Sequence, residues 1–190
     1  DFKLEGKDKK IKINNIQLCI EGYSSFVALA DNINYNGRDL LLCDIGGGTT
    51  DSCVFTYDFD EDQFIPGVPI TIPKGCIDMI DEITKKINSI DGADIKSEQV
   101  DAYIRRNKDE ILYGDNSYSI GQFVHVAKDT ANLIYNRLTN EYGSLDNYCI
   151  ILTGGGYKLF NKLVSDKISN QLHFSETDRF YANAIGFALQ

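Results

Sequence analysis

The sequence is poor in several features that mark common protein classes. It has no tryptophan, three prolines, two histidines and one methionine among 190 residues. Its longest apolar runs, Leu40–Cys43 and Cys149–Leu152, are far shorter than the roughly 20 residues that cross a bilayer. Nineteen basic against 28 acidic side chains give a net charge of −9, whereas nucleic acids and anionic membranes attract positive surfaces. We therefore expect neither direct DNA binding nor membrane binding.

The cysteines show no spacing typical of a metal site. There is no CxxC pair, and the two histidines, His125 and His173, are far from each other in the chain. Structural zinc sites need closely spaced soft ligands. Most of the cysteines lie in or beside apolar runs, so we expect buried, reduced thiols and a cytoplasmic protein.

The apolar pattern predicts an α/β fold with a mixed sheet flanked by helices. Continuous apolar runs favour buried strands over 40–45 and 148–152, and residues 11–20 and 52–59 also favour strands. Residues 64–72 contain prolines, which favour an extended edge strand. Helices are expected over 23–33, 75–90, 97–106, 119–142, 157–170 and 181–189. Paired strands followed by helices, and then a strand–glycine–helix unit, are typical of a mixed sheet.

The first notable motif is a glycine triplet between two expected strands, at 46–48 in the run CDIGGGTTD. Glycine adopts unusual backbone angles at little cost, and its missing side chain lets an anion approach the amide groups. Gly46, Gly47 and Gly48 are therefore candidate phosphate-binding residues, with the Thr49 and Thr50 hydroxyls as further donors. Asp44 precedes the loop, where a carboxylate can hold Mg²⁺ through water. The alternative is a tight hairpin turn.

A second triplet, Gly154, Gly155 and Gly156, joins an expected strand to an expected helix in the run ILTGGGYKLF. A helix N-terminus offers free amide groups and the positive end of a dipole, which suit an anion or a nucleotide. Tyr157 is a candidate for contact with the base. The alternative is a closely packed strand–helix turn.

Neither common nucleotide-binding fingerprint fits the two triplets. A P-loop needs Gly-Lys-Ser/Thr, and no lysine follows either triplet at that spacing. The dinucleotide pattern needs a third glycine that opens a helix, but Asp51 and Leu159 stand at those positions.

With both triplets in view, the chain resembles the second half of the actin-like ATPase superfamily, which has an RNase H-like fold. DIGGGTTD at 44–51 resembles its second phosphate loop, ILTGGGYKLF at 151–160 its adenosine loop, and ANAIGFAL at 182–189 its closing helix. Within the superfamily the chain is most similar to the ParM/StbA plasmid-segregation actins. We expect residues 1–190 to form a single α/β domain that lacks the first half of the nucleotide cleft.

The resemblance implies roles for individual residues. Glu21 matches the residue that orients the attacking water, with the alternative that it is an acid at a helix N-terminus. Asp44 matches the carboxylate linked to Mg²⁺, residues 46–50 would hold the phosphates of ATP, and residues 154–157 would hold the adenosine. The complete protein would form dynamic filaments and move plasmid DNA through a DNA-bound adaptor protein, and this chain alone would not hydrolyse ATP at a useful rate.

Two other functions remain open for the same superfold. One is a sugar kinase, an acyl kinase or an activator ATPase, whose substrate site would lie in the missing half. The other is a scaffold that binds nucleotide without turnover.

Overall fold

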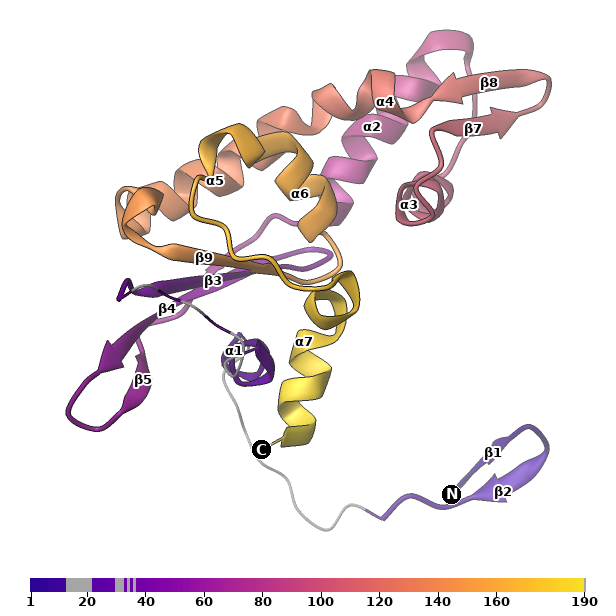
Figure 1. The fold of residues 1–190 in the computed structure, drawn as a ribbon. Coiled ribbons are helices and arrows are strands. Elements are labelled where there is room, and N and C mark those ends of the chain that lie inside the picture. Colours follow the sequence, from indigo (N-terminus) through magenta and orange to yellow (C-terminus); the bar gives the residue numbers. More distant parts are fainter. Residues whose placement is uncertain (13–21, 30–32, 34, 36, 190) are drawn as a thin grey trace.

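The computed structural model describes residues 1–12, 22–29, 33, 35 and 37–189. Its centre is a mixed sheet of strand order β5-β4-β3-β9, with β6 also paired to β4 (Figure 1). The strands are β3 (Leu40–Ile45), β4 (Thr50–Asp58), β5 (Gln63–Pro66), β6 (Ile70–Ile72) and β9 (Cys149–Thr153). The β3–β9 pair is parallel, and β4 pairs antiparallel with β3, β5 and β6. The mixed sheet expected from the sequence is thus confirmed.

Helices cover both faces of this sheet (Figure 1). One face carries α2 (Cys76–Asp91), α5 (Lys128–Tyr142) and α6 (Tyr157–Val164), and the other carries α1 (Tyr23–Leu29) and α7 (Glu176–Leu189). Beyond α2 lie α3 (Ser97–Arg105), the hairpin β7 (Glu110–Tyr113) and β8 (Asn116–Ser119), and α4 (Ile120–Phe123). A separate hairpin, β1 (Phe2–Leu4) with β2 (Lys7–Lys9), is exposed throughout.

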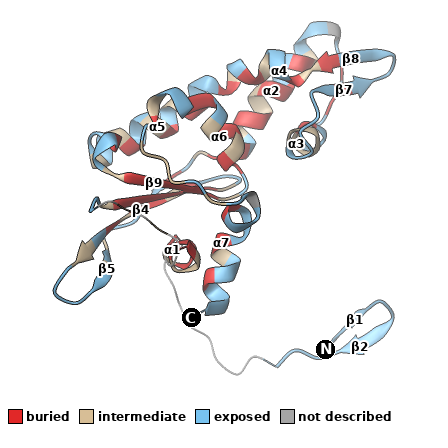
Figure 2. Ribbon diagram, viewed as in Figure 1, coloured by how far each residue is buried: buried red, intermediate tan, exposed pale blue. Residues whose placement is uncertain are grey.

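The central strand β3 is buried on both sides because its residues alternate between two cores (Figure 2). Leu41 and Ile45 belong to the larger core, formed with α2, α5 and α6. Leu40 and Leu42 belong to the smaller core, where Phe26 of α1 stacks on Phe55 of β4 with ring centroids 4.2 Å apart. This double burial explains why β3 reads as a continuous apolar run.

The two helices beneath the sheet are in direct backbone contact. A Cβ atom added at Gly186 of α7 would lie 1.6 Å from the carbonyl oxygen of Ser24 in α1. Only glycine permits this approach, so ANAIGFAL encodes a helix–helix contact. The observed α7 begins at Glu176, five residues before the expected helix.

Several element predictions need correction. The expected helix 119–142 is three segments: α4, a 3₁₀ turn over Val124–Ala127, and α5. The expected helix 157–170 stops at Val164 and continues as a 3₁₀ turn over Ser165–Lys167. The β1–β2 and β7–β8 hairpins were not predicted. The expected strand 11–20 lies almost wholly outside the described residues, as does the end of the expected helix 23–33.

The prediction of buried thiols holds for four of the cysteines. Cys43, Cys53, Cys76 and Cys149 are free and buried. Burial raises the pKa of Cys43 and Cys53, and raises that of Cys76 to about 11. These three thiols are therefore protonated at neutral pH. Cys19 lies outside the described residues.

Candidate functional site

The two glycine triplets lie together because the strands that precede them are parallel neighbours. Asp44 near the end of β3 is paired in register with Thr153 at the end of β9. Both strands therefore end at the same edge of the sheet, and a glycine triplet follows each. In open α/β sheets, ligands bind in the crevice beyond the carboxyl ends of such strands. The topology places the two motifs, about a hundred residues apart in sequence, at one site.

The first loop closes on itself and then contacts helix α2. The amide of Gly46 donates to the carbonyl of Thr49 at 2.9 Å. The carbonyls of Gly46 and Gly47 accept from the amides of Cys76 and Ile77, both at 2.9 Å. These two contacts cap the N-terminus of α2, and Gly47, Gly48 and Thr49 remain exposed at the loop tip.

The approach of this loop to α2 depends on a glycine outside both triplets. A Cβ atom at Gly75, which precedes α2, would lie 2.5 Å from the carbonyl oxygen of Gly47. Glycine at position 75 is thus a packing requirement of the first glycine loop.

The second loop packs against the end of β3. Gly154 has a φ of +85°, and its amide donates to the carbonyl of Arg179 at 3.1 Å. The amide of Gly156 donates to the carbonyl of Ile45 at 2.8 Å. A Cβ atom at Gly154 would lie 2.1 Å from Oδ1 of Asp44, and one at Gly156 would lie 2.7 Å from the Cβ of Cys76. The first and third glycines are therefore required for packing.

The middle glycine, Gly155, is different. It is exposed, and a Cβ atom there would meet nothing closer than 3.6 Å. Its nearest neighbours are the side-chain ends of Phe180 and Arg105. Packing within the chain does not require glycine at this position.

Asp44 is buried with 6% of its surface exposed. Its Oδ2 accepts a hydrogen bond from the side-chain amide of Asn183 in α7. The Oδ1 atom of Asn183 in turn accepts from the hydroxyl of Ser25 in α1 at 2.8 Å. These two hydrogen bonds, from Ser25 to Asn183 and from Asn183 to Asp44, thus connect α1 and α7 to the end of β3.

A cavity of about 600 Å³ opens beside the two loops. Gly47, Gly155 and Gly156 contribute to its lining, together with residues of α2, of α3 and of the turn between them. Its apolar walls include Ile77, Ile80 and Ile95. Its charged lining residues are Asp81, Lys96, Glu98, Asp101 and Arg105. An apolar lining with a few converging charged groups, at this volume, is typical of a small-molecule site.

Arg105 lies beside the exposed glycine and is held from two sides. Its Nε is 2.8 Å from both carboxylate oxygens of Asp101, and its guanidinium lies 5.7 Å from the ring centroid of Phe180. Arg105 and Gly155 also line a second hollow of about 310 Å³, which extends to Tyr157 and α7. The guanidinium therefore lies where the two hollows adjoin.

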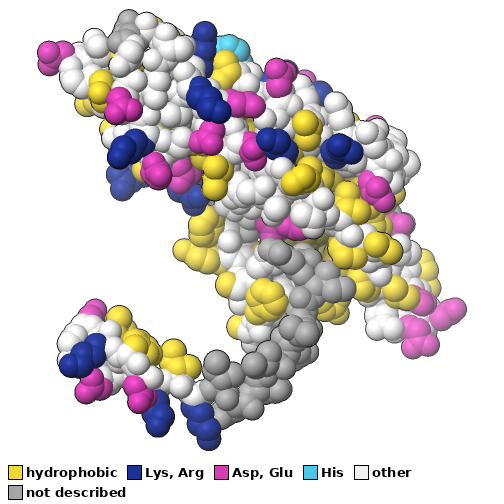
Figure 3. Space-filling view, turned by 180° about the vertical axis from the view of Figure 1, so that it is seen from behind, with side chains coloured by type: hydrophobic (Ala, Val, Ile, Leu, Met, Phe, Trp, Pro, Cys, Tyr) yellow, Lys and Arg dark blue, Asp and Glu magenta, His cyan; other side chains and the backbone are white. Residues whose placement is uncertain are grey.

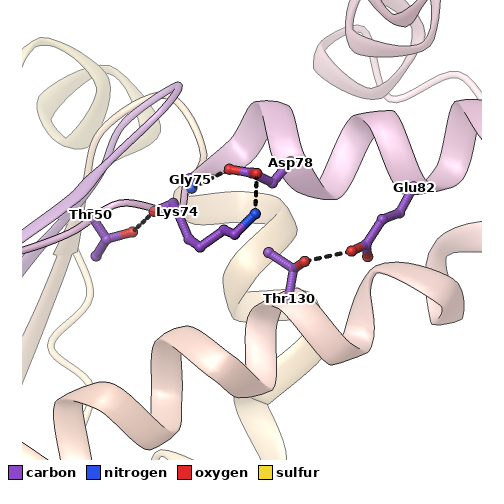
Figure 4. A network of polar contacts seen from close by, with 6 residues as sticks. All are labelled: Thr50, Lys74, Gly75, Asp78, Glu82 and Thr130. Carbon is purple, nitrogen blue, oxygen red and sulfur yellow. Dashed lines mark hydrogen bonds and ion pairs between the residues drawn. The ribbon is translucent and has the colours of Figure 1, made fainter.

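A polar network fixes the start of α2 (Figure 4). Nζ of Lys74 lies 2.6 Å from Oδ1 of Asp78, and the amide of Gly75 donates to Oδ2 of Asp78 at 3.0 Å. Burial by itself would raise the pKa of Asp78, but the hydrogen bonds from Lys74 and Gly75 outweigh it and lower that pKa. The hydrogen bond to Asp78 raises the pKa of Lys74. The two charged forms stabilise each other at neutral pH.

A match to a known family agrees with this geometry. The family model of the archaeal actin homologue MreB-like, C-terminal, matches residues 42–166, well over half of the chain. The chain belongs to this family. No curated protein sequence matches it.

Solved structures show that this MreB-like domain has the actin-like fold. It aligns with a ParM filament from Clostridium botulinum at a TM-score of 0.75 and 23% identity, covering 95% of this chain and 54% of that one. An archaeal actin homologue, Ta0583 in complex with ADP, aligns at a TM-score of 0.68 and 19% identity, with 88% and 54% covered. Bacillus thuringiensis ParM with ATP aligns at 0.63 and 16%, with 89% and 53% covered. The chain spans about half the length of each of these proteins.

The structure brings most of the expected site residues of the MreB-like domain together, but it corrects the expectations for Gly46 and Thr50. The amide of Gly46 is bonded to Thr49 within the loop and is not free for a phosphate. Thr50 is fully buried, and its hydroxyl donates to the carbonyl of Lys74 at 2.9 Å (Figure 4). That hydroxyl is therefore not a donor at the loop surface, contrary to expectation. Thr49 is exposed, and its hydroxyl donates to Asp51 at 3.0 Å. Glu21 lies outside the described residues.

Tyr157 is only partly placed as expected. Its side chain is 8% exposed, and the guanidinium of Arg179 lies 5.0 Å from its ring centroid. It lines the second hollow and is not among the residues that line the larger cavity. Most of the ring packs within the domain, so any contact with a base involves its remaining exposed edge.

No sequence motif pointed to the cavity wall formed by α2 and α3. Asp101 and Arg105 lie on the short amphipathic helix α3, and Lys96 directly precedes it; in sequence these charges look like an ordinary solvated face. The sequence of α3, SEQVDAYIR, contains no nucleotide-binding motif. Only the fold reveals that this helix faces the glycine loops.

The described residues contain no group of three or more histidine, cysteine, aspartate or glutamate side chains placed to hold a metal ion. Asp44 therefore fits Mg²⁺ only as one ligand among waters and phosphate oxygens, which is the coordination that this ion prefers. Within the described ranges, no helix has the length and apolar character needed to span a bilayer.

Proposed function

We propose that this domain binds ATP with Mg²⁺ in the cavity between the two glycine loops and helices α2 and α3. The observation that carries the proposal is the meeting of both loops at the carboxyl ends of β3 and β9, beside a cavity of about 600 Å³. The relatives with bound ADP and ATP support it, since they share the fold.

The phosphates would lie at the exposed tip of the first loop. Gly47 and Gly48 leave the backbone open to an anion, and Thr49 offers a hydroxyl after it leaves Asp51. Gly46 shapes the loop, since its amide already donates to the carbonyl of Thr49. The adenosine would lie against Gly155 and Gly156, between the loop and α3. Arg105 offers a flat cation beside Gly155, which suits stacking on a base.

Asp44 is the candidate carboxylate for Mg²⁺, held through water. Magnesium supplies positive charge that neutralises the phosphates when it is bound. Asn183 orients the Asp44 carboxylate by donating to its Oδ2. Glu21 is proposed to orient the attacking water in the complete protein, on the resemblance to actin-like ATPases alone.

For the complete protein we propose a filament-forming ATPase of the ParM/StbA type. It would self-associate with ATP and connect to plasmid DNA through a DNA-bound adaptor. The fold shared with a ParM filament supports this role. The acidic net charge of −9 supports an adaptor in place of direct DNA contact.

The test is equilibrium binding of a fluorescent ATP analogue to the chain, with and without Mg²⁺. Gly155→Val should weaken binding at least tenfold, because a branched side chain at this exposed position would occupy space in both hollows. Gly67→Ala is the control, since its Cβ atom would be 3.4 Å from the carbonyl of Val54 and Gly67 lines neither hollow. Asp44→Asn should remove the Mg²⁺ dependence.

Undiminished binding by the Gly155→Val variant would place the nucleotide elsewhere. No binding by the unaltered chain, even with Mg²⁺, would contradict the proposal for this domain.

A further inference from the structure

The β4–β5 turn presents an exposed aromatic ring among acidic side chains. Phe59 is 78% exposed at the tip of the turn. Four acidic residues surround it in sequence: Asp58, Asp60, Glu61 and Asp62. The next basic residue is Lys74. Figure 3 shows this acidic group at the lower right edge of the molecule, next to apolar side chains.

This turn is held in shape before any partner arrives. Oδ1 of Asp58 accepts from the amides of Asp60 and Glu61 at 2.9 and 3.2 Å. The hydroxyl of Tyr57 donates to Asp62, and the ring of Phe59 meets that of Tyr57 edge to face at 5.1 Å. A preordered turn loses little conformational entropy when it docks, which favours its use as a contact.

A small apolar hollow with basic side chains around it lies elsewhere on the same chain. It has a volume of about 160 Å³, close to that of the cavities that take up a benzene ring. Four apolar side chains contribute to its lining: Ile104, Ile120, Val124 and Leu159.

The charged residues of this hollow are mostly basic. Lys108, Lys158 and Lys162 line it, with Asp109 as the single acidic residue. An apolar hollow with lysines around it complements an aromatic ring with acids around it, in both polarity and charge.

The turn and the hollow lie on different sides of the molecule. Figure 1 shows the β4–β5 turn beyond one edge of the sheet, whereas α3, α4 and α6, which form the hollow, lie on the other side. A contact between a turn and a hollow on separate surfaces is head-to-tail: it does not close into a symmetric dimer, and it adds further copies until the rotation between them closes a ring or, if it never closes, along an open filament.

We propose that the β4–β5 turn of one copy docks into this lysine-lined hollow of the next copy, with the Phe59 ring on the apolar floor. The proposal rests on the self-association in the proposed function and names the surfaces that would carry it. A second copy is the favoured partner because both complementary surfaces occur on this one chain. The net charge of −9 repels two copies in general, so a local pairing of acidic with basic side chains is needed for them to meet. The contact is small, so we expect weak association.

The test uses two variants of the chain, one for each surface. Phe59→Ser removes the ring from the turn, and the double variant Lys108→Glu with Lys162→Glu reverses the charge of the hollow. Leu112→Ser, at a side chain that is 67% exposed on β7, and Lys85→Glu with Lys86→Glu, on α2, are the matched controls. Sedimentation velocity over a concentration series, with and without Mg-ATP, measures association.

We expect the unaltered chain and both controls to form species larger than dimers as concentration rises. Each test variant alone should self-associate with a dissociation constant at least about tenfold higher than that of the unaltered chain, as is typical when a central contact is lost. An equimolar mixture of the two test variants should form dimers and stop there, because one supplies only an intact turn and the other only an intact hollow. Added salt should weaken the association.

Three results would overturn the proposal: an unaltered chain that stays monomeric, a Phe59→Ser variant that associates like the unaltered chain, or a mixture that forms no dimers. ATP binding is measured in the same samples. Normal ATP binding with no association would refute this contact and leave the nucleotide site standing, whereas lost ATP binding with normal association would do the reverse.

Discussion

Two adjacent glycines of the second loop should respond in opposite ways to the same substitution. Gly154 has a φ of +85°, and an added Cβ atom would lie 2.1 Å from Oδ1 of Asp44 and 2.5 Å from the carbonyl oxygen of Ile45. Gly155 has no positive φ, and its Cβ atom would meet side-chain atoms at ordinary distances, from 3.6 Å. The pair separates packing from ligand access within one loop.

The magnitude for Gly154→Ala follows from two costs. Holding alanine in the left-handed region costs about 1–3 kcal/mol, and crowding a packed site costs about 1–3 kcal/mol more. We expect a loss of about 2–6 kcal/mol in the free energy of unfolding, a large part of the stability of an ordinary domain. Gly155→Ala should leave the stability unchanged or raise it by about 0.4–1 kcal/mol, because alanine restricts the unfolded chain.

Urea unfolding followed by far-ultraviolet circular dichroism measures both variants, since the chain has no tryptophan. With a denaturant slope of roughly 2 kcal/mol per molar urea, the Gly154→Ala midpoint should fall by about 1–3 M. Equal midpoints for the two variants would refute the reasoning, because the close packing of Gly154 against β3 would then contribute nothing to the free energy of unfolding.

Three further predictions concern the polar contacts and the core. Asp78→Asn should lower stability by about 0.5–2 kcal/mol at neutral pH, as the loss of a helix cap does. Because the folded state lowers the pKa of Asp78, this contribution is present above the unfolded pKa and is lost as the pH falls through the folded pKa. The gap between the original and variant proteins should therefore close in acid, and a gap that persists there would contradict the assignment. Asn183→Ala removes the α7 donor to buried Asp44 and should cost about 1–3 kcal/mol in urea unfolding, whereas an unchanged midpoint would mean that this bond contributes nothing. Phe160→Ala, at a side chain with no exposed surface, should cost about 3–5 kcal/mol, and a loss under 1 kcal/mol would mean that the core collapses to fill the space.

The strands and the glycine motifs were predictable because their signals are local. A continuous apolar run marks a strand buried on both faces, and β3 and β9 were recognised in this way. Pro66 restricts its segment to an edge, and it lies on edge strand β5. The β7–β8 hairpin was missed although Gly114-Asp115 stands between its strands, a signal of a two-residue turn.

The expected helix over 119–142 was wrong because apolar spacing alone does not show where a helix tightens. Val124 and Ala127 are buried within the 3₁₀ turn as they would be within an α-helix. The burial pattern therefore continues across the break, and the backbone angles that distinguish the two helices leave no clear mark on the sequence.

The sequence by itself determined the local chemistry of this protein: two glycine loops after apolar strands, an aspartate before the first, and a mixed sheet with helices on both faces. Tertiary structure alone decided which groups meet. It buried the Thr50 hydroxyl against Lys74, joined Asp44 to Asn183 and placed Arg105 beside Gly155. The physical reason is that glycine conformation and apolar periodicity act over a few neighbouring residues, whereas a hydrogen bond between residues 139 positions apart depends on the packing of the whole chain.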